Sequence, residues 1–131
     1  MTNGSDASSE LHVAAGNRDE SRFLQAIGLA LRARHAVAGH TGVLQSIQEG
    51  KVRLVIVASD AGANGMKKYR DKCTFYQVPL VTASDRATLG VACGRSYTVV
   101  VGVTDDGFAR MLSELVREIY GGEAFGETSS L

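Results

Sequence analysis

The chain has 131 residues, of which 44% are hydrophobic, and this is enough for one domain with a buried core. No apolar run approaches the roughly 20 residues that span a bilayer, and residues 1–10 lack the basic start and apolar stretch of a secretory signal, so we expect a cytoplasmic protein with no membrane association. The formal net charge is zero, yet residues 21–103 carry eleven bases against four acids. This basic middle favours an anionic partner.

Residues 1–18 are small and polar, with few large apolar side chains. Such a segment buries too little surface to offset the entropy of ordering, so the sequence predicts a disordered acidic tail there. A single folded domain is expected over 19–120, followed by a flexible tail over 121–131. Cys73 and Cys93 do not form a CxxC pair, and the three histidines do not lie near them at metal-ligand spacing. We therefore expect two unpaired buried thiols, no metal and no other cofactor.

The spacing of apolar residues predicts helices that alternate with short strands. In chain order, the expected elements are a helix over 19–34, a helix from Thr41 to about 49, a strand over 54–58, a helix over about 64–76, a strand over 78–82, a helix capped by Ser84-Asp85 and ended by Gly94, a strand over 97–103, and a helix opened by Asp105-Asp106. Phe108, Met111, Leu112, Leu115, Val116 and Ile119 are expected to line the buried face of the last helix. The pattern predicts an α/β fold that begins with a helix: a three-layer α/β/α sandwich with a small mixed, mostly parallel-type sheet.

Two loops invite a catalytic or nucleotide-binding interpretation, and neither fits it. The loop from Gly62 to Lys67 follows a strand and opens a helix, but its glycine spacing differs from that of a phosphate-binding loop. Asp60 ends a strand like a phosphoacceptor, but the acidic pair and lysine that complete such a site are missing. A turn or capping role for Asp60 is the better interpretation. No nucleophile–base or paired-carboxylate arrangement stands out, so we expect no enzyme.

A basic approach leads into the second predicted helix. Arg32 and Arg34 precede the loop Gly39-His40-Thr41-Gly42. The N–H groups at a helix start attract phosphate, and Thr41 and Gln45 share one helix face because they are four residues apart. These two side chains can meet base edges while the arginines hold the backbone of a nucleic acid. The alternative is an ordinary helix start with solvated basic neighbours.

Three segments together resemble a known family. They are FLQAIGLALRARHAVAGHTGVLQSIQEGKVRLVIVASDAG, TFYQVPLVTASDRATLGVACG and VVVGVTDDGFARML. In this collinear order, over roughly Arg22–Val116, the chain resembles the ribosomal-protein superfamily that binds kink-turn RNA, namely archaeal large-subunit ribosomal protein seven-Ae and its relatives. It is most similar to the small bacterial YlxQ branch. The resemblance implies an α/β/α fold and RNA binding without catalysis.

The resemblance also implies where RNA binds. In the family, a G-x-N-E-x-x-K motif enters the second helix and reads the sheared G·A pairs of the kink. Its matching positions here run from Gly39 to Gln45, with Thr41, Gly42 and Gln45 in place of Asn, Glu and Lys. The family's second RNA-facing loop matches Gly94 to Tyr97. There Arg95 can hold phosphate, and Tyr97 can stack on a base if it is exposed; the alternative for Tyr97 is a core residue at a strand start.

Together, the basic approach and the resemblance give a predicted site and function. The expected RNA-binding residues are Arg32, Arg34, Gly39, His40, Thr41, Gly42, Gln45, Arg95, Ser96 and Tyr97. The expected function is non-catalytic recognition of structured RNA, either kink-turn-like or ribosomal, in association with translation. Ribosomal or translation-factor proteins are further expected partners. The alternative function is a protein-interaction or ribosome-assembly factor that retained the fold and lost kink-turn recognition.

Overall fold

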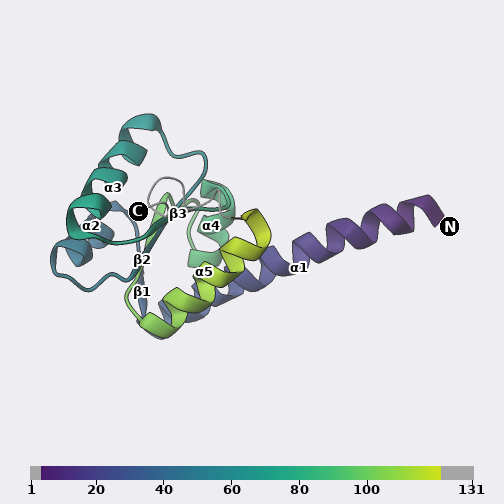
Figure 1. The fold of residues 1–131 in the computed structure, drawn as a ribbon, viewed down its shortest axis with the longest axis horizontal. Coiled ribbons are helices and arrows are strands. Elements are labelled where there is room, and N and C mark those ends of the chain that lie inside the picture. The colour runs from purple at the N-terminus through teal and green to yellow at the C-terminus, as the bar shows by residue number, and fades with distance from the viewer. Residues whose placement is uncertain (1–3, 122–131) are drawn as a thin grey trace.

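The computed structural model describes the backbone of residues 4–121 and the side chains of residues 18–121. In chain order, its elements are α1 (Gly4–Arg32), β1 (Ala36–Ala38), α2 (His40–Gln48), β2 (Leu54–Val57), α3 (Ala63–Tyr76), β3 (Leu80–Thr82), α4 (Arg86–Cys93), β4 (Val100–Val103) and α5 (Asp106–Tyr120). The strands form one sheet in the order β1-β4-β2-β3, with helices on both of its faces (Figure 1). The predicted α/β/α sandwich that starts with a helix is confirmed.

The direction of the strands differs in part from the prediction. β2 and β3 pair in parallel around α3, as the strand–helix–strand pattern indicates, but β4 is antiparallel to both β1 and β2. The expected mixed sheet is confirmed, but it is not mostly parallel, because only β2 and β3 pair in parallel. The physical reason lies after α4, where the chain turns back and the N–H of Thr98 donates to the carbonyl of Arg86 at 2.9 Å. β4 thus begins at the end of the sheet where β2 and β3 finish, with Val100 opposite Val57, and it runs in the opposite direction.

The strand β1 was not predicted from the sequence. It has only three residues, Ala36–Ala38, and alanine has little intrinsic preference for strands. It is a strand because its backbone pairs with β4, from Ala36 opposite Val103 to Ala38 opposite Val101. This pairing between segments distant in the sequence leaves no local signal in the sequence.

The sheet is buried on both faces, which explains why its strands read as continuous apolar runs. In β2, Leu54 and Ile56 face the core formed with α1, α4 and α5, whereas Val55 and Val57 face the core formed with α2 and α3. All four side chains are buried. The alternation follows from the two-residue period of a strand.

Two predicted helix starts are confirmed and one is wrong. Asp85 and Asp105 cap α4 and α5, and each carboxylate accepts a hydrogen bond at 2.8 Å from the backbone N–H three residues ahead. This hydrogen bond to Asp85 lowers the pKa of its carboxyl. Thr41 does not cap α2, because the backbone turns at Gly39 and the helix already begins at His40.

The buried face of α5 is smaller than predicted. Met111 is 42% exposed and does not belong to it.

The first helix is longer than predicted. α1 begins at Gly4 rather than near Asp19, and its N-terminal part extends away from the other elements (Figure 1). Residues 4–18 contain no proline, the residue that most strongly breaks a helix, so the segment can continue the packed part of α1. The division into tail, domain and tail stays a prediction, and residues 122–131 lie outside the described residues.

The two free thiols are expected to differ in reactivity. Cys73 is buried, and burial raises the pKa of its thiol to about 12. Cys93 is half-buried; burial raises its pKa as well, while the Thr98 hydroxyl and the Arg95 charge oppose the shift. A disulfide reagent at pH 8 is therefore expected to modify Cys93 first and Cys73 only on unfolding, with thiol release followed by absorbance. Rapid modification of both thiols in the folded protein contradicts this prediction.

The pKa of Cys73 also predicts a change in stability at alkaline pH. Because its folded pKa is raised from 9.0 to about 12, the neutral thiol contributes its full stability below pH 9, and this contribution is lost as the pH rises toward 12. Replacement by serine is expected to reduce this dependence in urea titrations between pH 8 and 10.5. An unchanged pH dependence in that variant contradicts the assignment.

Candidate functional site

The turn into α2 depends on a glycine. At Gly39 the backbone has φ 101° and ψ 156°, a conformation that residues with a Cβ atom rarely adopt. The Gly39 N–H donates to the carbonyl of Val100 at 2.9 Å, which anchors the turn beside the start of β4. Among the described residues, no side chain caps α2, and its first turn has no acidic residue. Backbone N–H groups at this helix start are therefore available to an anionic ligand.

Close packing fixes the orientation of α2. Val43 and Ile47 are fully buried, and a Cβ on Gly102 of β4 would lie 3.3 Å from Cγ1 of Val43. The glycine in β4 therefore lets α2 approach the sheet. On the outer side of α2, Thr41 and Gln45 are exposed, and the Gln45 amide donates to the Glu49 carboxylate at 3.1 Å. The predicted exposed face of α2 is present.

The loop between α4 and β4 presents three exposed side chains. Gly94 ends α4 in the left-handed conformation, and the N–H of Arg95 donates to the carbonyl of Gly90 at 2.8 Å. Arg95, Ser96 and Tyr97 follow on the surface. Tyr97 is 65% exposed, so the alternative that it is a core residue is wrong, and its ring is accessible for stacking.

The two predicted loops meet in space. A Cβ on Gly39 would lie only 3.0 Å from Nη1 of Arg95, so the guanidinium rests against the glycine backbone. The contact places a basic side chain beside the open start of α2, although the two residues are far apart in the sequence. We call the surface formed by Gly39–Gln45 and Arg95–Tyr97 the two-loop surface.

The strand β1 separates Arg34 from Gly39, whereas Arg32 lies beside the end of α4. The carbonyl of His35 accepts a hydrogen bond at 2.8 Å from Thr104, after the end of β4, whereas Gly39 pairs with Val100 at its beginning. The two hydrogen bonds lie at opposite ends of β4, so β1 separates His35, and Arg34 before it, from Gly39 by roughly 13 Å at the usual rise per residue. The guanidinium of Arg32 turns back along α1, with Nη1 3.5 Å from the Cβ position of Gly28. The sequence groups Arg34 with the loop at Gly39, but the unpredicted strand β1 lies between them and holds them apart.

His40 has a partner that the sequence did not reveal. Its Nδ1 is hydrogen bonded to the Tyr69 hydroxyl of α3 at 3.0 Å, with the two ring centroids 5.7 Å apart. Tyr69 is buried, and burial raises the pKa of its phenol. The apolar stripe of α3 predicts a buried Tyr69, but not the contact with His40. This contact ties the start of α2 to the middle of α3.

The remaining polar groups considered in the sequence have structural roles. Asp60 accepts a hydrogen bond at 2.9 Å from the N–H of Arg86 and lies 3.5 Å from its guanidinium, so the capping interpretation is confirmed. Among the residues that the structure describes, no group of three or more His, Cys, Asp or Glu side chains is placed to hold a metal ion. No helix within this described part is long and apolar enough to cross a membrane.

The molecule is thus an α/β/α sandwich in which two exposed loops meet at the start of one helix. The chain belongs to the ribosomal protein L7Ae/L30e/S12e/Gadd45 family, whose model matches residues 21–113. This match confirms the resemblance stated from the sequence.

Individual relatives agree with the family assignment. The chain is 43% identical over 90 residues to the RNA-binding protein YlxQ of Bacillus subtilis strain 168, covering 69% of this chain and 90% of the relative. It is 36% identical over 101 residues to YlxQ of Enterococcus faecium, covering 77% and 95%. A solved structure of a Bacillus halodurans protein of unknown function has a TM-score of 0.68 at 45% identity and covers 72% and 95%. The 15.5 kD RNA binding protein of Giardia lamblia shares the fold, with a TM-score of 0.62 at 23% identity over 78% and 88%.

Replacement of Gly39 by alanine is expected to displace Arg95 and strain the turn into α2. The positive φ of 101° is unfavourable for alanine, and the new methyl group would lie 3.0 Å from Nη1 of Arg95. We expect a loss of about 1–2 kcal/mol in the free energy of unfolding, measured by urea titration. Gly62→Ala is the control, because a Cβ there meets nothing within 4 Å and its φ of −64° is ordinary. Equal stability of the two variants contradicts the role given to Gly39.

Proposed function

We propose that the chain binds structured RNA of the kink-turn kind at the two-loop surface, without catalysing a reaction. The observation that carries this proposal is the contact between the Arg95 guanidinium and the backbone of Gly39, because it joins the two loops into one surface. The names of the two curated relatives, both RNA-binding proteins, support it. We further propose that the protein acts in the bacterial cytoplasm, in association with ribosomal RNA or the translation machinery.

Each side chain of the surface has a chemical role in this proposal. The N–H groups at the start of α2 and the Arg95 guanidinium bind phosphate oxygens. The Thr41 hydroxyl and the Gln45 amide donate to and accept from base edges, the amide being released from Glu49. Tyr97 stacks on an unpaired base. His40 is held against Tyr69 and thereby positions the first turn of α2.

The test is a titration of the protein into a labelled kink-turn RNA and an unkinked duplex of equal length. Arg95→Ala is expected to weaken kink-turn binding roughly 10-fold and to reduce the salt slope by about 0.7–0.9, as expected for the loss of one phosphate contact. Arg34→Ala is the matched control, because this arginine is also exposed but lies at the other end of β1. Equal losses in the two variants, or no preference of the protein for the kinked RNA, overturn the proposal.

A protein-interaction or assembly role is the second candidate function. It is favoured by the exposed apolar side chains of the groove between α1 and α4, where Val91 is 80% and Leu29 52% exposed. Apolar groups gathered on a surface are typical of sites that contact other proteins. A pull-down with Val91→Asp as the control distinguishes the two candidates. A partner protein that survives nuclease treatment and is lost with Val91→Asp supports the second candidate, whereas a partner lost with nuclease alone supports the first.

A further inference from the structure

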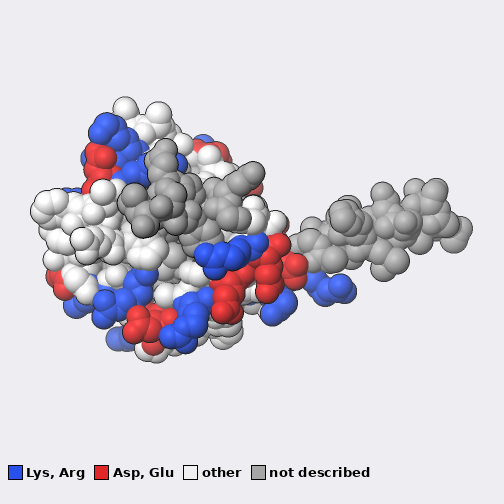
Figure 2. All heavy atoms as spheres, viewed as in Figure 1, with Lys and Arg blue, Asp and Glu red and all other residues white. Residues whose placement is uncertain are grey.

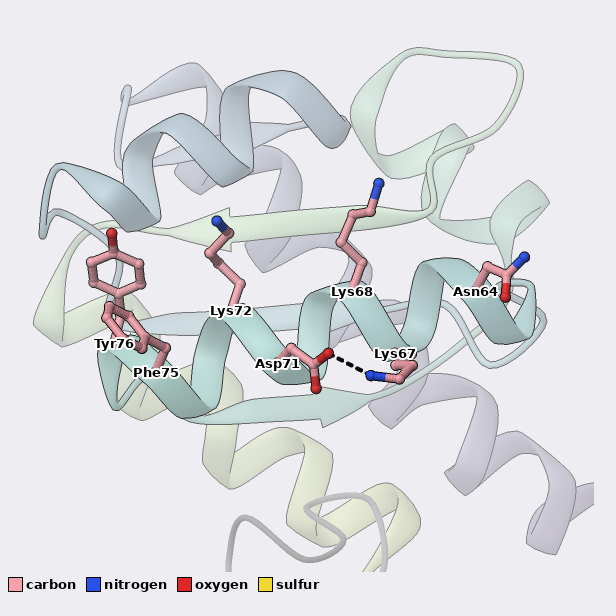
Figure 3. Close-up of a pocket in the computed structure, with 7 residues that line it drawn as sticks. All are labelled: Asn64, Lys67, Lys68, Asp71, Lys72, Phe75 and Tyr76. Carbon is pink, nitrogen blue, oxygen red and sulfur yellow. Dashed lines mark hydrogen bonds and ion pairs between the residues drawn. The ribbon is translucent and has the colours of Figure 1, made fainter.

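The outer face of α3 carries a basic and aromatic groove that the two-loop surface does not include. It lies between two rows of side chains spaced one turn apart, one containing Lys68, Lys72 and Tyr76 and the other Lys67, Asp71 and Phe75 (Figure 3). In the space-filling view, basic side chains over α3, with acidic atoms beside them, form a group separated by white surface from the charges of the lower edge (Figure 2). The groove is open to solvent.

The charges in the groove are of two kinds. Lys67 is paired with Asp71 at 2.7 Å, and this partner raises the pKa of its ammonium group. Lys68 and Lys72 make no ion pair with any residue that the structure describes, and Figure 3 shows both extending in the same direction from the helix. Because they are four residues apart, their Cα atoms are separated by about 6 Å along the helix axis, similar to the spacing of successive phosphates along an RNA strand.

An aromatic platform follows these lysines at the end of α3. Phe75 is 78% exposed, and its ring meets that of Tyr76 edge to face, with centroids 4.9 Å apart at 74°. The edge contact with Tyr76 holds the Phe75 ring, while the ring remains accessible to solvent. Single-stranded nucleic acids are recognised by positive charges that follow the phosphate backbone and by accessible aromatic rings on which bases stack. The outer face of α3 has both.

The position of α3 connects this groove to the two-loop surface. The Tyr69 hydroxyl, next to Lys68 in the sequence, is bonded to His40 at the start of α2. Ala58, which follows β2 and precedes α3, donates to the carbonyl of Val99, and Gly39 donates to the carbonyl of the next residue, Val100. The chain therefore enters α3 at the same end of the sheet as Gly39. A strand that leaves an RNA bound at the start of α2 can therefore pass directly onto α3.

We propose that the outer face of α3 binds a single-stranded segment of RNA flanking the structured element, with Lys68 and Lys72 on successive phosphates and Phe75 stacked on a base. This inference rests on the proposed function and adds a second contact surface to it. It extends recognition from the folded RNA element to the strand beside it.

The test compares three RNAs: a kink-turn hairpin alone, the same hairpin with a single-stranded 5′ extension of about ten nucleotides, and the same hairpin with a 3′ extension of that length. The protein is expected to bind one extended RNA at least 5-fold more tightly, with a salt slope steeper by about 1.4 for two phosphate contacts. Lys68→Gln/Lys72→Gln is expected to lose this gain and to bind the plain hairpin unchanged. Arg18→Gln/Arg110→Gln, which removes two exposed charges from α1 and α5, is the control and is expected to keep the gain.

A second measurement tests Phe75 separately. Fluorescence of 2-aminopurine in the extension is expected to be quenched on binding, and Phe75→Ala is expected to abolish the quenching. No gain from either extension, or a gain that survives Lys68→Gln/Lys72→Gln, overturns the inference. Binding of an acidic peptide that depends on these lysines, without any gain from the extension, overturns it in favour of a protein partner.

The two proposals fail in different ways. If the plain hairpin is not bound, the proposed function is wrong, and a single-stranded oligonucleotide then tests α3 directly. Binding of that oligonucleotide that is lost in Lys68→Gln/Lys72→Gln supports the groove, and binding equal in both proteins rejects it.

Discussion

Replacement of Gly90 by alanine is expected to cause the largest loss of stability among single substitutions at the glycines of this protein. A Cβ at this position of α4 would lie 2.6 Å from Cα and 2.8 Å from N of Tyr97, and 2.9 Å from the carbonyl oxygen of Arg95. All three atoms belong to the backbone, so the clash cannot be relieved by a side-chain rotation. The loop must move away from α4, and this breaks the hydrogen bond between Arg95 and Gly90.

The expected loss in the free energy of unfolding for Gly90→Ala is about 3 kcal/mol, the upper end of the usual range for overpacking. It is measured by urea titration followed by circular dichroism. Gly42→Ala is the matched control, because a Cβ there meets nothing within 4 Å and alanine is favoured in a helix; we expect it to gain up to about 1 kcal/mol. A Gly90→Ala protein as stable as the unmodified one contradicts the packing described for this loop.

Restoration of two family residues in α2 is expected to raise the affinity for kink-turn RNA. The double variant Gly42→Glu/Gln45→Lys recovers the acidic and basic positions of the family motif. The glutamate fits because a Cβ at Gly42 meets nothing within 4 Å, and it enters a first helical turn that has no acidic residue. We expect about 10-fold tighter binding, since a well-placed base contact contributes roughly 1–3 kcal/mol.

The measurement is the ratio of dissociation constants for a kink-turn RNA and an unkinked duplex. Gly42→Glu/Gln48→Lys is the control, because it adds the same two charges to α2 but places the lysine three residues further along, near the end of the helix. It keeps the acidic position and lacks the basic one, so it is expected to raise the ratio less than the restored variant does. If the restored variant tightens binding to both RNAs equally, the gain comes from charge alone and the base-reading role of positions 42 and 45 is rejected.

The sequence predicted those parts of the fold that have local signals. The caps Asp85 and Asp105 and the apolar run of β2 were predicted correctly, because each rests on residues within a few positions. The antiparallel direction of β4 and the existence of β1 were not, because both depend on pairing between segments distant in the sequence. The family resemblance, which implies the same α/β/α fold, did not reveal these two features either.

The candidate site shows the same division. Gly39 and the exposed start of α2 follow from the glycine and from the pattern of α2, and the contact between Gly39 and Arg95 agrees with the two loops that the resemblance implies. The sequence places Arg34 next to these loops, whereas β1 separates Arg34 from Gly39, because residues close in the sequence need not be close in space. Its role in RNA binding stays a prediction. The groove on α3 was also missed as a site. The apolar spacing in α3 predicts that Tyr76 shares the buried stripe of Tyr69 and that the lysines face solvent, whereas Tyr76 is 38% exposed beside them.

The two outer strands of the sheet limit the pairing of this sheet with strands of other chains. β1 and β3 are each three residues long, and Pro79, directly before β3, has no N–H to donate. Short edges of this kind offer few free backbone groups to an incoming strand, so they resist sheet extension and the aggregation that follows from it. Partners must instead be recognised by helix surfaces and loops, which leaves the sheet as a rigid support.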